Sequence, residues 1–128
     1  MVLLDTHTLL WWTLEPDKLS KRALEECSII EKEHGYISSI SIWEIGIKIK
    51  KKKLEIPIHF ETYVDRVKQI ENLKIIPITE GIWVKNLSLN WDHSDPADRT
   101  IVASAIIEGI PIVSKDEKIK KYYKNTIW

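Results

Sequence analysis

The chain has 128 residues, the length of one compact domain with a buried core, so we treat residues 1–128 as a single unit. Its apolar content of 44% and charged content of 30% are ordinary for a globular protein and argue against disorder. The formal net charge is zero, which excludes a strongly basic nucleic-acid-binding domain, so any affinity for nucleic acid must come from local patches.

The N-terminal segment is predicted to be a buried strand that leads into a helix. Residues 2–4 are apolar and Asp5 follows them, a pattern typical of a central strand covered on both faces. The segment lacks the basic residues of a signal peptide, and Asp5 and His7 interrupt its apolar run. A short helix is expected at 8–14, ended by Pro16.

Apolar spacing and start signals predict the elements of the middle of the chain. Residues 19–30 have apolar positions at helical spacing, with Ser20 as a start signal. Gly35 interrupts that pattern, and Ser41 is expected to open a later helix. The expected elements are a helix at 19–30, a strand at 36–38, a helix at 41–50 and a helix at 60–73.

The last part of the chain again alternates strands with helices. Pro77 suggests that its strand lies at a sheet edge, and Gly109 is a plausible end signal for the preceding helix. The expected elements are a strand at 75–78, a helix at 80–89, a helix from about 96 to 108, and strands at 111–113 and 126–127. The alternation predicts an α/β fold, a three-layer α/β/α sandwich around a mainly parallel four- or five-stranded sheet.

Nothing in the sequence suggests secretion or membrane insertion. Cys27 is the only cysteine, so the chain cannot form an intrachain disulfide, which fits a reducing compartment. No apolar run approaches the roughly 18 residues of a membrane span. We expect a soluble, cytoplasmic protein.

Four acidic residues stand where the predicted fold brings them together. Asp5 ends the first strand, and Asp116 lies three residues after Val113, in the fourth. Glu44 and Asp98 are each expected in the first turn of a helix. Because functional groups gather beyond the carboxyl ends of parallel strands, the four carboxylates meet at one edge if the first and fourth strands are neighbours.

Each of these acids also has a purely structural explanation. Residues 41–44 and 114–117 match the capping box, a serine at the N-cap and an acid at N3, and in the second of them Asp116 is incidental. Residues 95–98 give an N-cap acid, a proline at N1 and an acid facing the helix dipole. Asp5 is a possible cap of the helix that follows it. Taken singly, most of the acids are explained at least as well by capping as by a site.

The joint pattern favours a metal site. Neighbouring carboxylates repel by roughly 3 kcal/mol per pair at an effective dielectric near 20, so a cluster needs protons or cations. Carboxylates without cysteine suit the hard ions Mg²⁺ or Mn²⁺. Such a centre performs metal-assisted hydrolysis of phosphodiesters.

Four segments resemble the PIN-domain family, specifically the VapC-type toxin ribonucleases of toxin–antitoxin pairs. These segments are LLDTHTLLWW at 3–12, ISSISIWEIGIKIK at 37–50, HSDPADRTIVASAI at 93–106 and IVSKDEKI at 112–119, and they run the length of the chain. The resemblance implies a PIN fold and a metal-dependent endoribonuclease. It implies that the metal-holding, catalytic acids are Asp5, Glu44, Asp98 and Asp116, with Asp95, Thr6 and Ser114 as accessory residues.

Basic residues near the acids are candidates for RNA contact. One run is Lys48, Lys50, Lys51, Lys52 and Lys53, and a second is Lys115, Lys118, Lys120, Lys121 and Lys124. The alternative is a solvated helix end, where lysines complement the dipole. Because both runs follow predicted ligands, we favour phosphate contact. Arg99 contacts either RNA phosphate or an acid of its own helix, and His93 is more simply a surface hydrogen-bonding residue.

The tryptophans are interpreted mainly as packing residues. Trp11 and Trp12 are adjacent on a helix and cannot face the same way, so one packs on the sheet and the other is half-exposed or covered by a partner. Trp43, Trp83 and Trp91 are expected in the core or in packing contacts.

Three other functions compete with the nuclease. A haloacid-dehalogenase-like phosphatase needs a second acid two residues after the first, where this chain has His7. A response-regulator receiver needs paired early acids. A PIN-like module without catalysis would bind only RNA or a partner. For the nuclease, the expected partners are an RNA substrate, a small cognate antitoxin and a second copy of the chain, with no membrane.

Overall fold

The computed structural model describes residues 1–128 and contains one five-stranded sheet in which every pair of neighbouring strands is parallel. The strands are β1 (Val2–Leu4), β2 (Gly35–Ser38), β3 (Leu73–Ile76), β4 (Ile112–Val113) and β5 (Thr126–Ile127). Their order across the sheet is β3-β2-β1-β4-β5. β1 is therefore central and lies next to β4, which is the condition on which the expected meeting of the four acids depends.

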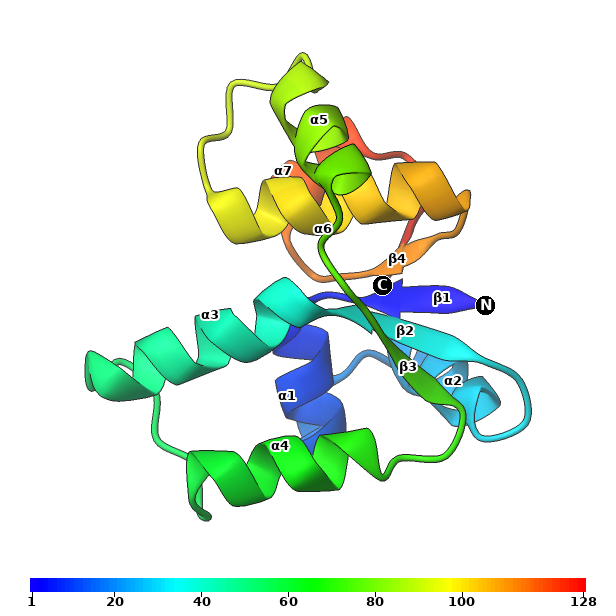
Figure 1. The fold of residues 1–128 in the computed structure, drawn as a ribbon. Helices are drawn as coiled ribbons and strands as arrows, with labels where there is room; N and C mark the ends of the chain where they lie inside the picture. Colours follow the sequence, from blue (N-terminus) through cyan, green and yellow to red (C-terminus); the bar gives the residue numbers. More distant parts are fainter.

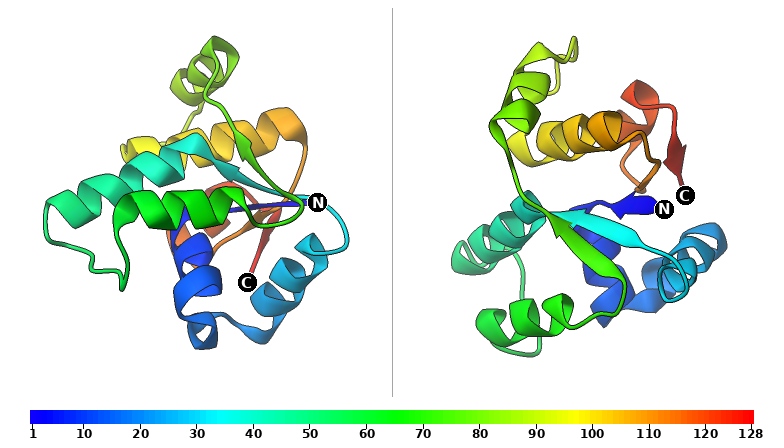
Figure 2. Two further views of the ribbon diagram at one scale, coloured as in Figure 1. Left: turned by 60° about the horizontal axis from the view of Figure 1, so that its bottom comes forward. Right: turned by 45° about the vertical axis from the view of Figure 1, so that its right-hand side comes forward.

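Helices cover both faces of the sheet and complete the predicted three-layer α/β/α sandwich. They are α1 (Thr6–Leu14), α2 (Lys21–Ile30), α3 (Ser39–Lys50), α4 (Phe60–Lys68), α5 (Glu80–Ser88), α6 (Pro96–Glu108) and α7 (Glu117–Tyr122), with a short 3₁₀ turn at Pro16–Lys18. α5, α6 and α7 lie on one side of the sheet and α1, α2 and α4 on the other (Figure 1), as the right-hand view of Figure 2 also shows. None of the helices has the length and apolar character that crossing a membrane requires.

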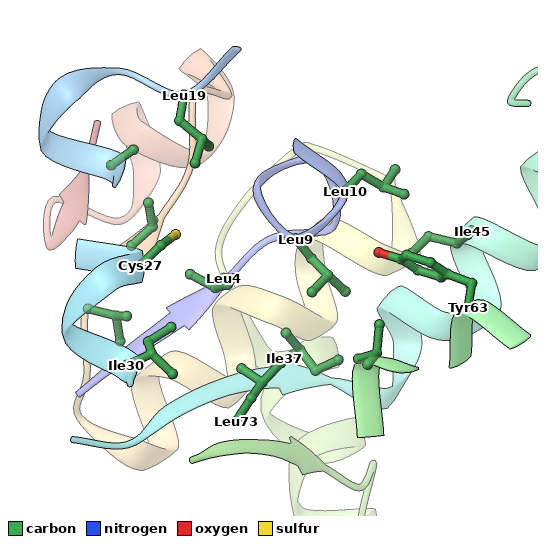
Figure 3. Packing of buried hydrophobic residues seen from close by; sticks show 14 residues of the cluster. Leu4, Leu9, Leu10, Leu19, Cys27, Ile30, Ile37, Ile45, Tyr63 and Leu73 are labelled. Carbon is green, nitrogen blue, oxygen red and sulfur yellow. The ribbon is translucent and has the colours of Figure 1, made fainter. Parts of the chain in front are cut away.

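The core consists of two apolar clusters, one on each face of the sheet. Successive side chains of β1 alternate between them, because strand side chains point to opposite faces: Leu4 belongs to the first cluster and Leu3 to the second. In the first cluster Leu4 and Ile37 lie against α1, α2 and α4, where Cys27 and Tyr63 are buried (Figure 3). Burial in this layer raises the pKa of the Cys27 thiol to about 12, so the thiol is inert at neutral pH.

Several start and stop signals act as predicted. Ser20 caps α2 by accepting a hydrogen bond from the Ala23 amide at 3.0 Å. Asp95 caps α6, with Pro96 in its first turn, and Gly109 ends that helix in the left-handed conformation at φ 67°. β3 lies at the sheet edge, as the proline that follows it indicated.

Several predicted boundaries are wrong. The strand expected at 75–78 spans Leu73–Ile76, and three helix boundaries differ as well. The helix expected to open at Ser41 begins two residues earlier, because Ser38 is its N-cap and accepts a hydrogen bond from the Ile40 amide. The helix expected at 60–73 ends at Lys68, since Asn72 adopts a left-handed φ of 65° and turns the chain into β3. The first helix also begins earlier than expected, at Thr6.

The interpretation of four tryptophans is corrected as well. Trp43 and Trp83 are 54% and 44% exposed, so neither is a core residue. Trp11 is half-buried because the ring of Trp128 lies 5.7 Å from it, and its neighbour Trp12 is half-buried too. Both rings pack against the core of this face, so the expected difference between a packed ring and a half-exposed or partner-covered ring is absent.

The topology fixes the position of a potential site. The chain leaves β1 to form β2 on one side and later returns to form β4 on the other, so the strand order reverses between β1 and β4. In open parallel sheets, such a switch point at the carboxyl ends of the strands is where ligands bind. Asp5 and Ser114 are the residues that follow β1 and β4, and they lie at this point.

Candidate active site

Asp5 is a buried carboxyl group at the carboxyl end of β1. Its Oδ1 accepts a hydrogen bond from the Thr8 amide at 2.8 Å, so the predicted capping role is confirmed. Its Oδ2 accepts a hydrogen bond from the Ser114 hydroxyl. Only 5% of the residue is exposed, and burial raises the pKa of the carboxyl above its usual range although both hydrogen bonds oppose the shift. An acid in this position favours a nearby proton or cation.

Ser114 connects Asp5 to Asp116. Besides donating to Asp5, its Oγ accepts a hydrogen bond from the Asp116 amide at 3.0 Å. Asp116 is itself the N-cap of α7, where its Oδ1 accepts from the Ile119 amide at 3.0 Å. The capping box expected at 114–117, with Asp116 incidental, is therefore wrong. The reason is that the Ser114 side chain turns inward to the β1 acid.

Asp95 and Asp98 project from the start of α6. Asp95 Oδ1 accepts from the Asp98 amide at 2.9 Å, and Asp98 Oδ2 lies 2.7 Å from His93 Nε2. Burial raises the pKa of Asp98 to about 6; the hydrogen bond with His93 opposes the shift, and the charges of Asp95 and Asp116 add to it. The acids of α6 and α7 are thus close enough to repel each other. His93, expected to be a surface residue, is a direct partner of a predicted ligand.

Glu44 reaches the same region from α3. It is the sixth residue of that helix, so its predicted place in the first turn is wrong, and it plays no part in capping. Its carboxylate is 3.5 Å from the ammonium group of Lys48, one turn along. The hydroxyls of Ser41 and Thr6, 2.9 Å apart and both buried, join α3 to α1 and hold Glu44 beside the β1 edge.

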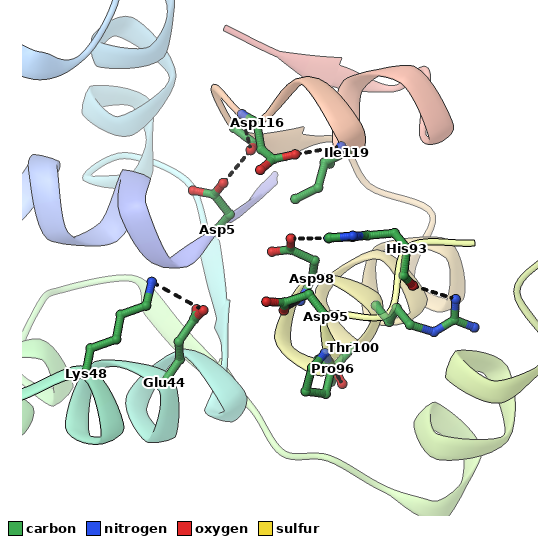
Figure 4. Close-up of polar contacts among 12 residues, drawn as sticks. Asp5, Glu44, Lys48, His93, Asp95, Pro96, Asp98, Thr100, Asp116 and Ile119 are labelled. Carbon is green, nitrogen blue, oxygen red and sulfur yellow. Dashed lines mark hydrogen bonds and ion pairs between the residues drawn. The ribbon is translucent and has the colours of Figure 1, made fainter. Parts of the chain in front are cut away.

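These acids line one open cavity of about 440 Å³, which we call the acidic cavity. It has no hydrophobic lining residue; its walls are Asp5, Thr6, His7, Glu44, Lys48, His93, Asp95, Asp98, Asp116, Glu117 and Lys118. Six carboxylates therefore face two ammonium groups. Figure 4 shows that the acids come from separate elements around this space. All four predicted catalytic acids are present, together with the accessory residues Asp95 and Thr6, while Ser114 lies behind Asp5.

The donor set suits a hard divalent cation, although the side chains are not gathered into a ligand cluster. No group of three metal-binding side chains lies close enough together to hold an ion. Each acid instead faces a local partner, such as Lys48 for Glu44 and His93 for Asp98. Their oxygen donors, their excess negative charge and the raised pKa of Asp98 fit Mg²⁺ or Mn²⁺. Each of these contacts uses one carboxylate oxygen, Glu44 Oε2 and Asp98 Oδ2, and leaves the second oxygen of each group for an ion.

Arg99 holds the loop beside the cavity. All five of its N–H groups donate hydrogen bonds, four of them to the backbone carbonyls of Asn86, Leu89, Trp91 and His93, at 2.6–3.2 Å, and the fifth to the Asn86 side chain at 3.4 Å. Since a guanidinium has five donors, none is left for phosphate. The predicted contact with an acid of its own helix is wrong. Arg99 positions the backbone that carries His93.

The two lysine runs divide into residues inside and outside the cavity. Lys48 lines it, whereas Lys50 and the exposed residues 51–53 lie outside its walls, so their contact with RNA stays a prediction. Lys118 of the second run is a wall residue. The sequence signalled it only as one of five similar lysines. Only its position on α7, two residues after the Asp116 cap, distinguishes it.

Comparison with known proteins places this geometry in context. A family model described as PIN domain matches residues 2–125. Ribonuclease VapC22 of Mycobacterium tuberculosis is 28% identical over 122 residues, which cover 94% of this chain and 91% of that protein.

Two solved structures share the fold over nearly the whole chain. A toxin–antitoxin complex from Klebsiella pneumoniae matches with a TM-score of 0.68 at 18% identity, covering 100% of this chain and 97% of that one. VapBC2 from Rickettsia felis, bound to a DNA fragment from the promoter of the pair, matches with a TM-score of 0.67 at 19% identity, covering 99% and 96%. The two TM-scores establish a common fold.

Proposed function

The chain belongs to the PIN-domain family, and from that membership we propose that it is a cytoplasmic, metal-dependent endoribonuclease of the VapC type, the toxin of a toxin–antitoxin pair. The observation that carries the proposal is the acidic cavity, where carboxylates from α1, α3, α6 and α7 and the residues before them surround a space without apolar walls. The curated relative, a ribonuclease by name, supports the choice of RNA as the substrate.

Asp5, Glu44, Asp98 and Asp116 hold one or two Mg²⁺ or Mn²⁺ ions in this proposal. Support comes from the all-oxygen donor set and from the cost of leaving Asp5 and Asp98 charged in a buried, acidic setting. When bound, such ions supply Lewis-acid polarisation of the phosphate and a lower pKa for the attacking water.

The other residues of the cavity orient these acids and the substrate. Ser114 and the Thr8 amide fix the Asp5 carboxyl, and His93 fixes that of Asp98. Lys118 supplies positive charge to a phosphate that enters the cavity. Groups that are fixed before the substrate arrives reduce the entropic cost of reaching the transition state.

Cleavage of a labelled single-stranded RNA tests the proposal. We expect cleavage with Mg²⁺ or Mn²⁺ and none in EDTA. Asp116→Asn should abolish cleavage without unfolding the protein, because asparagine caps a helix as well as aspartate does. Asp65→Asn, on the exposed side of α4, is the matched control and should cleave normally.

Two other outcomes would contradict the proposal. Turnover of p-nitrophenyl phosphate in place of RNA cleavage would support a haloacid-dehalogenase-like phosphatase. RNA binding without turnover of either substrate, in the presence of Mg²⁺ or Mn²⁺, would support a PIN-like binding module.

A toxin of this type needs a protein that silences it in its own cell. We therefore propose a small cognate antitoxin, and the structural relatives that are toxin–antitoxin complexes support this choice. Expression of the chain alone should arrest growth, and co-expression of the short open reading frame beside its gene should restore growth. Growth arrest that no neighbouring gene relieves would contradict the pairing.

We also propose that the isolated chain forms a homodimer. Trp83, Val84 and Leu87 of α5 are 44%, 68% and 81% exposed, and exposed apolar groups of this kind mark interfaces. Light scattering should give twice the mass of the chain, and Leu87→Glu should give a monomer. A monomeric mass for the unaltered chain would refute the proposal.

A further inference from the structure

A second cavity opens directly beside the acidic cavity and has a different chemistry. It has a volume of about 530 Å³, within the range of roughly 300–1,000 Å³ that small-molecule sites occupy. Its walls include two aromatic rings and two lysines, namely Trp91, Tyr122, Lys118 and Lys121. His93 and Lys118 line both cavities, so the two spaces adjoin.

The aromatic part of this wall is ordered. The rings of Trp91 and Tyr122 stack with centroids 4.6 Å apart and an interplanar angle of 11°. His93 lies on Trp91 at 4.9 Å, tilted by 54°. Arg99 fixes the backbone beneath, since it donates to the carbonyls of Trp91 and His93 at 2.7 and 3.1 Å. Trp91 and Tyr122 are half-buried, so part of each ring faces the cavity.

The two lysines of this wall form no ion pair. Lys48 is paired with Glu44 at 3.5 Å and Lys120 with Glu117 at 3.5 Å, but neither Lys118 nor Lys121 makes an ion pair. Asp92 is the only acid among the residues that line the second cavity, and its side chain is exposed. An anion beside the strongly acidic cavity is therefore best accommodated here.

We propose that this cavity is a nucleotide subsite, which holds the nucleotide of a single-stranded RNA next to the scissile phosphate. Its base extends the stack of Trp91 and Tyr122, and its phosphate contacts Lys121 and Lys118. Unpaired bases stack on aromatic side chains, and the phosphates of the same strand bind lysine ammonium groups. The bases of a double helix are paired and stacked, so they cannot stack on such a wall. This inference rests on the proposed ribonuclease function and adds to it the residues that hold a nucleotide beside the cleavage site.

Two variants separate the parts of the subsite. Lys121→Ala removes a charge that lines only this cavity. We expect a higher KM with unchanged kcat, and a log–log salt dependence of binding that is shallower by about 0.7, the value for one phosphate contact on a single strand. Tyr122→Leu removes the stack but keeps apolar volume, and it should raise KM by about fivefold or more without changing the salt dependence. Lys21→Ala, an exposed and unpaired lysine on α2, is the matched control and should change neither quantity.

A substrate series distinguishes stacking from a structural role of Tyr122. Single-stranded RNAs that lack one base, at each position around the cleavage site in turn, are bound to Asp116→Asn protein in EDTA. We expect one flanking position at which loss of the base weakens binding by about fivefold or more, and we expect Tyr122→Leu to abolish that difference. The position of the effect identifies the side of the scissile phosphate.

The subsite and the nuclease assignment fail in different ways. No metal-dependent RNA cleavage by the unaltered protein would refute the ribonuclease. Normal cleavage with KM values for Lys121→Ala and Tyr122→Leu equal to that of Lys21→Ala would refute the subsite and leave the ribonuclease intact. Equal binding of every base-deleted RNA would refute it independently, even if Tyr122→Leu failed to fold.

Discussion

Replacing Asp98 by asparagine should stabilise the metal-free protein, and more so at pH 8 than at pH 5. In the native state, burial and the charges of Asp95 and Asp116 raise the pKa of Asp98 from 3.8 to about 6. The native protein therefore binds the proton more tightly than the unfolded chain does. Since stability falls with pH wherever the native state holds more protons, the contribution of Asp98 falls as pH rises from 3.8 to about 6 and is constant above.

The size of the effect follows from the same values. Ionising Asp98 in the folded protein costs about 3 kcal/mol, and about half of that cost is already present at pH 5. Against it stands the hydrogen bond with His93, which is worth about 1 kcal/mol. We expect Asp98→Asn to gain about 1–2 kcal/mol of unfolding free energy at pH 8 in EDTA. The gain should be smaller by about 1 kcal/mol at pH 5.

Urea denaturation at the two pH values in EDTA measures these differences. Asp65→Asn is the control for removing an exposed aspartate, and a His93→Gln background is the second control, because it removes the histidine that contacts Asp98 Oδ2. Saturating Mg²⁺ should reverse the order, since an ion that binds only the native state stabilises the protein with the intact ligand set. A difference between wild type and Asp98→Asn that is equal at pH 5 and pH 8 would refute the electrostatic reasoning.

Three further predictions concern the metal, the loop and the lysine run. Calorimetry with Mn²⁺ should show binding that Asp5→Asn weakens at least tenfold, and equal affinity would remove Asp5 from the ligand set. Arg99→Lys should retain the fold but raise KM for RNA, because an ammonium has only three donors for the carbonyls that position the loop; an unaltered KM would leave Arg99 without a role in the site. Replacing residues 50–53 by alanine should flatten the salt dependence of RNA binding by about 0.7 per lost phosphate contact, and an unchanged slope would identify them as a solvated helix end.

The order of the elements could be predicted because each is bounded by residues with strong local preferences. Ser20, the Asp95–Pro96 pair and Gly109 mark helix ends by capping chemistry, which acts within a few residues and is visible in sequence. The end of α4 could not be predicted in this way. Its apolar spacing continues through Ile70 to Leu73, and only the left-handed turn at Asn72 shows that the last part is a strand.

The acids of the site were predictable, whereas their partners were not. Asp5 and Asp116 follow short apolar strands, and sheet topology alone brings the ends of such strands together. The contact of His93 with Asp98 and the hydrogen bonds of Arg99 depend on the path of an irregular loop at residues 89–95. No periodicity describes such a loop, so the second cavity could not be predicted from the sequence.

Capping and membership of a site turn out to be compatible explanations for the same acid. Asp5, Asp95 and Asp116 each cap a helix, which fixes their carboxyl groups at the edge of the sheet. A helix N-terminus stabilises one such charge by about 0.3–1 kcal/mol, and each of these charges also faces the other carboxylates of the cavity. Asp98 and Glu44 do not cap a helix. Capping therefore does not explain why these two carboxylates lie among the other acids of the cavity. The excess negative charge is therefore a reason to expect a cation at this edge, since the fold itself supplies only the ammonium groups of two lysines.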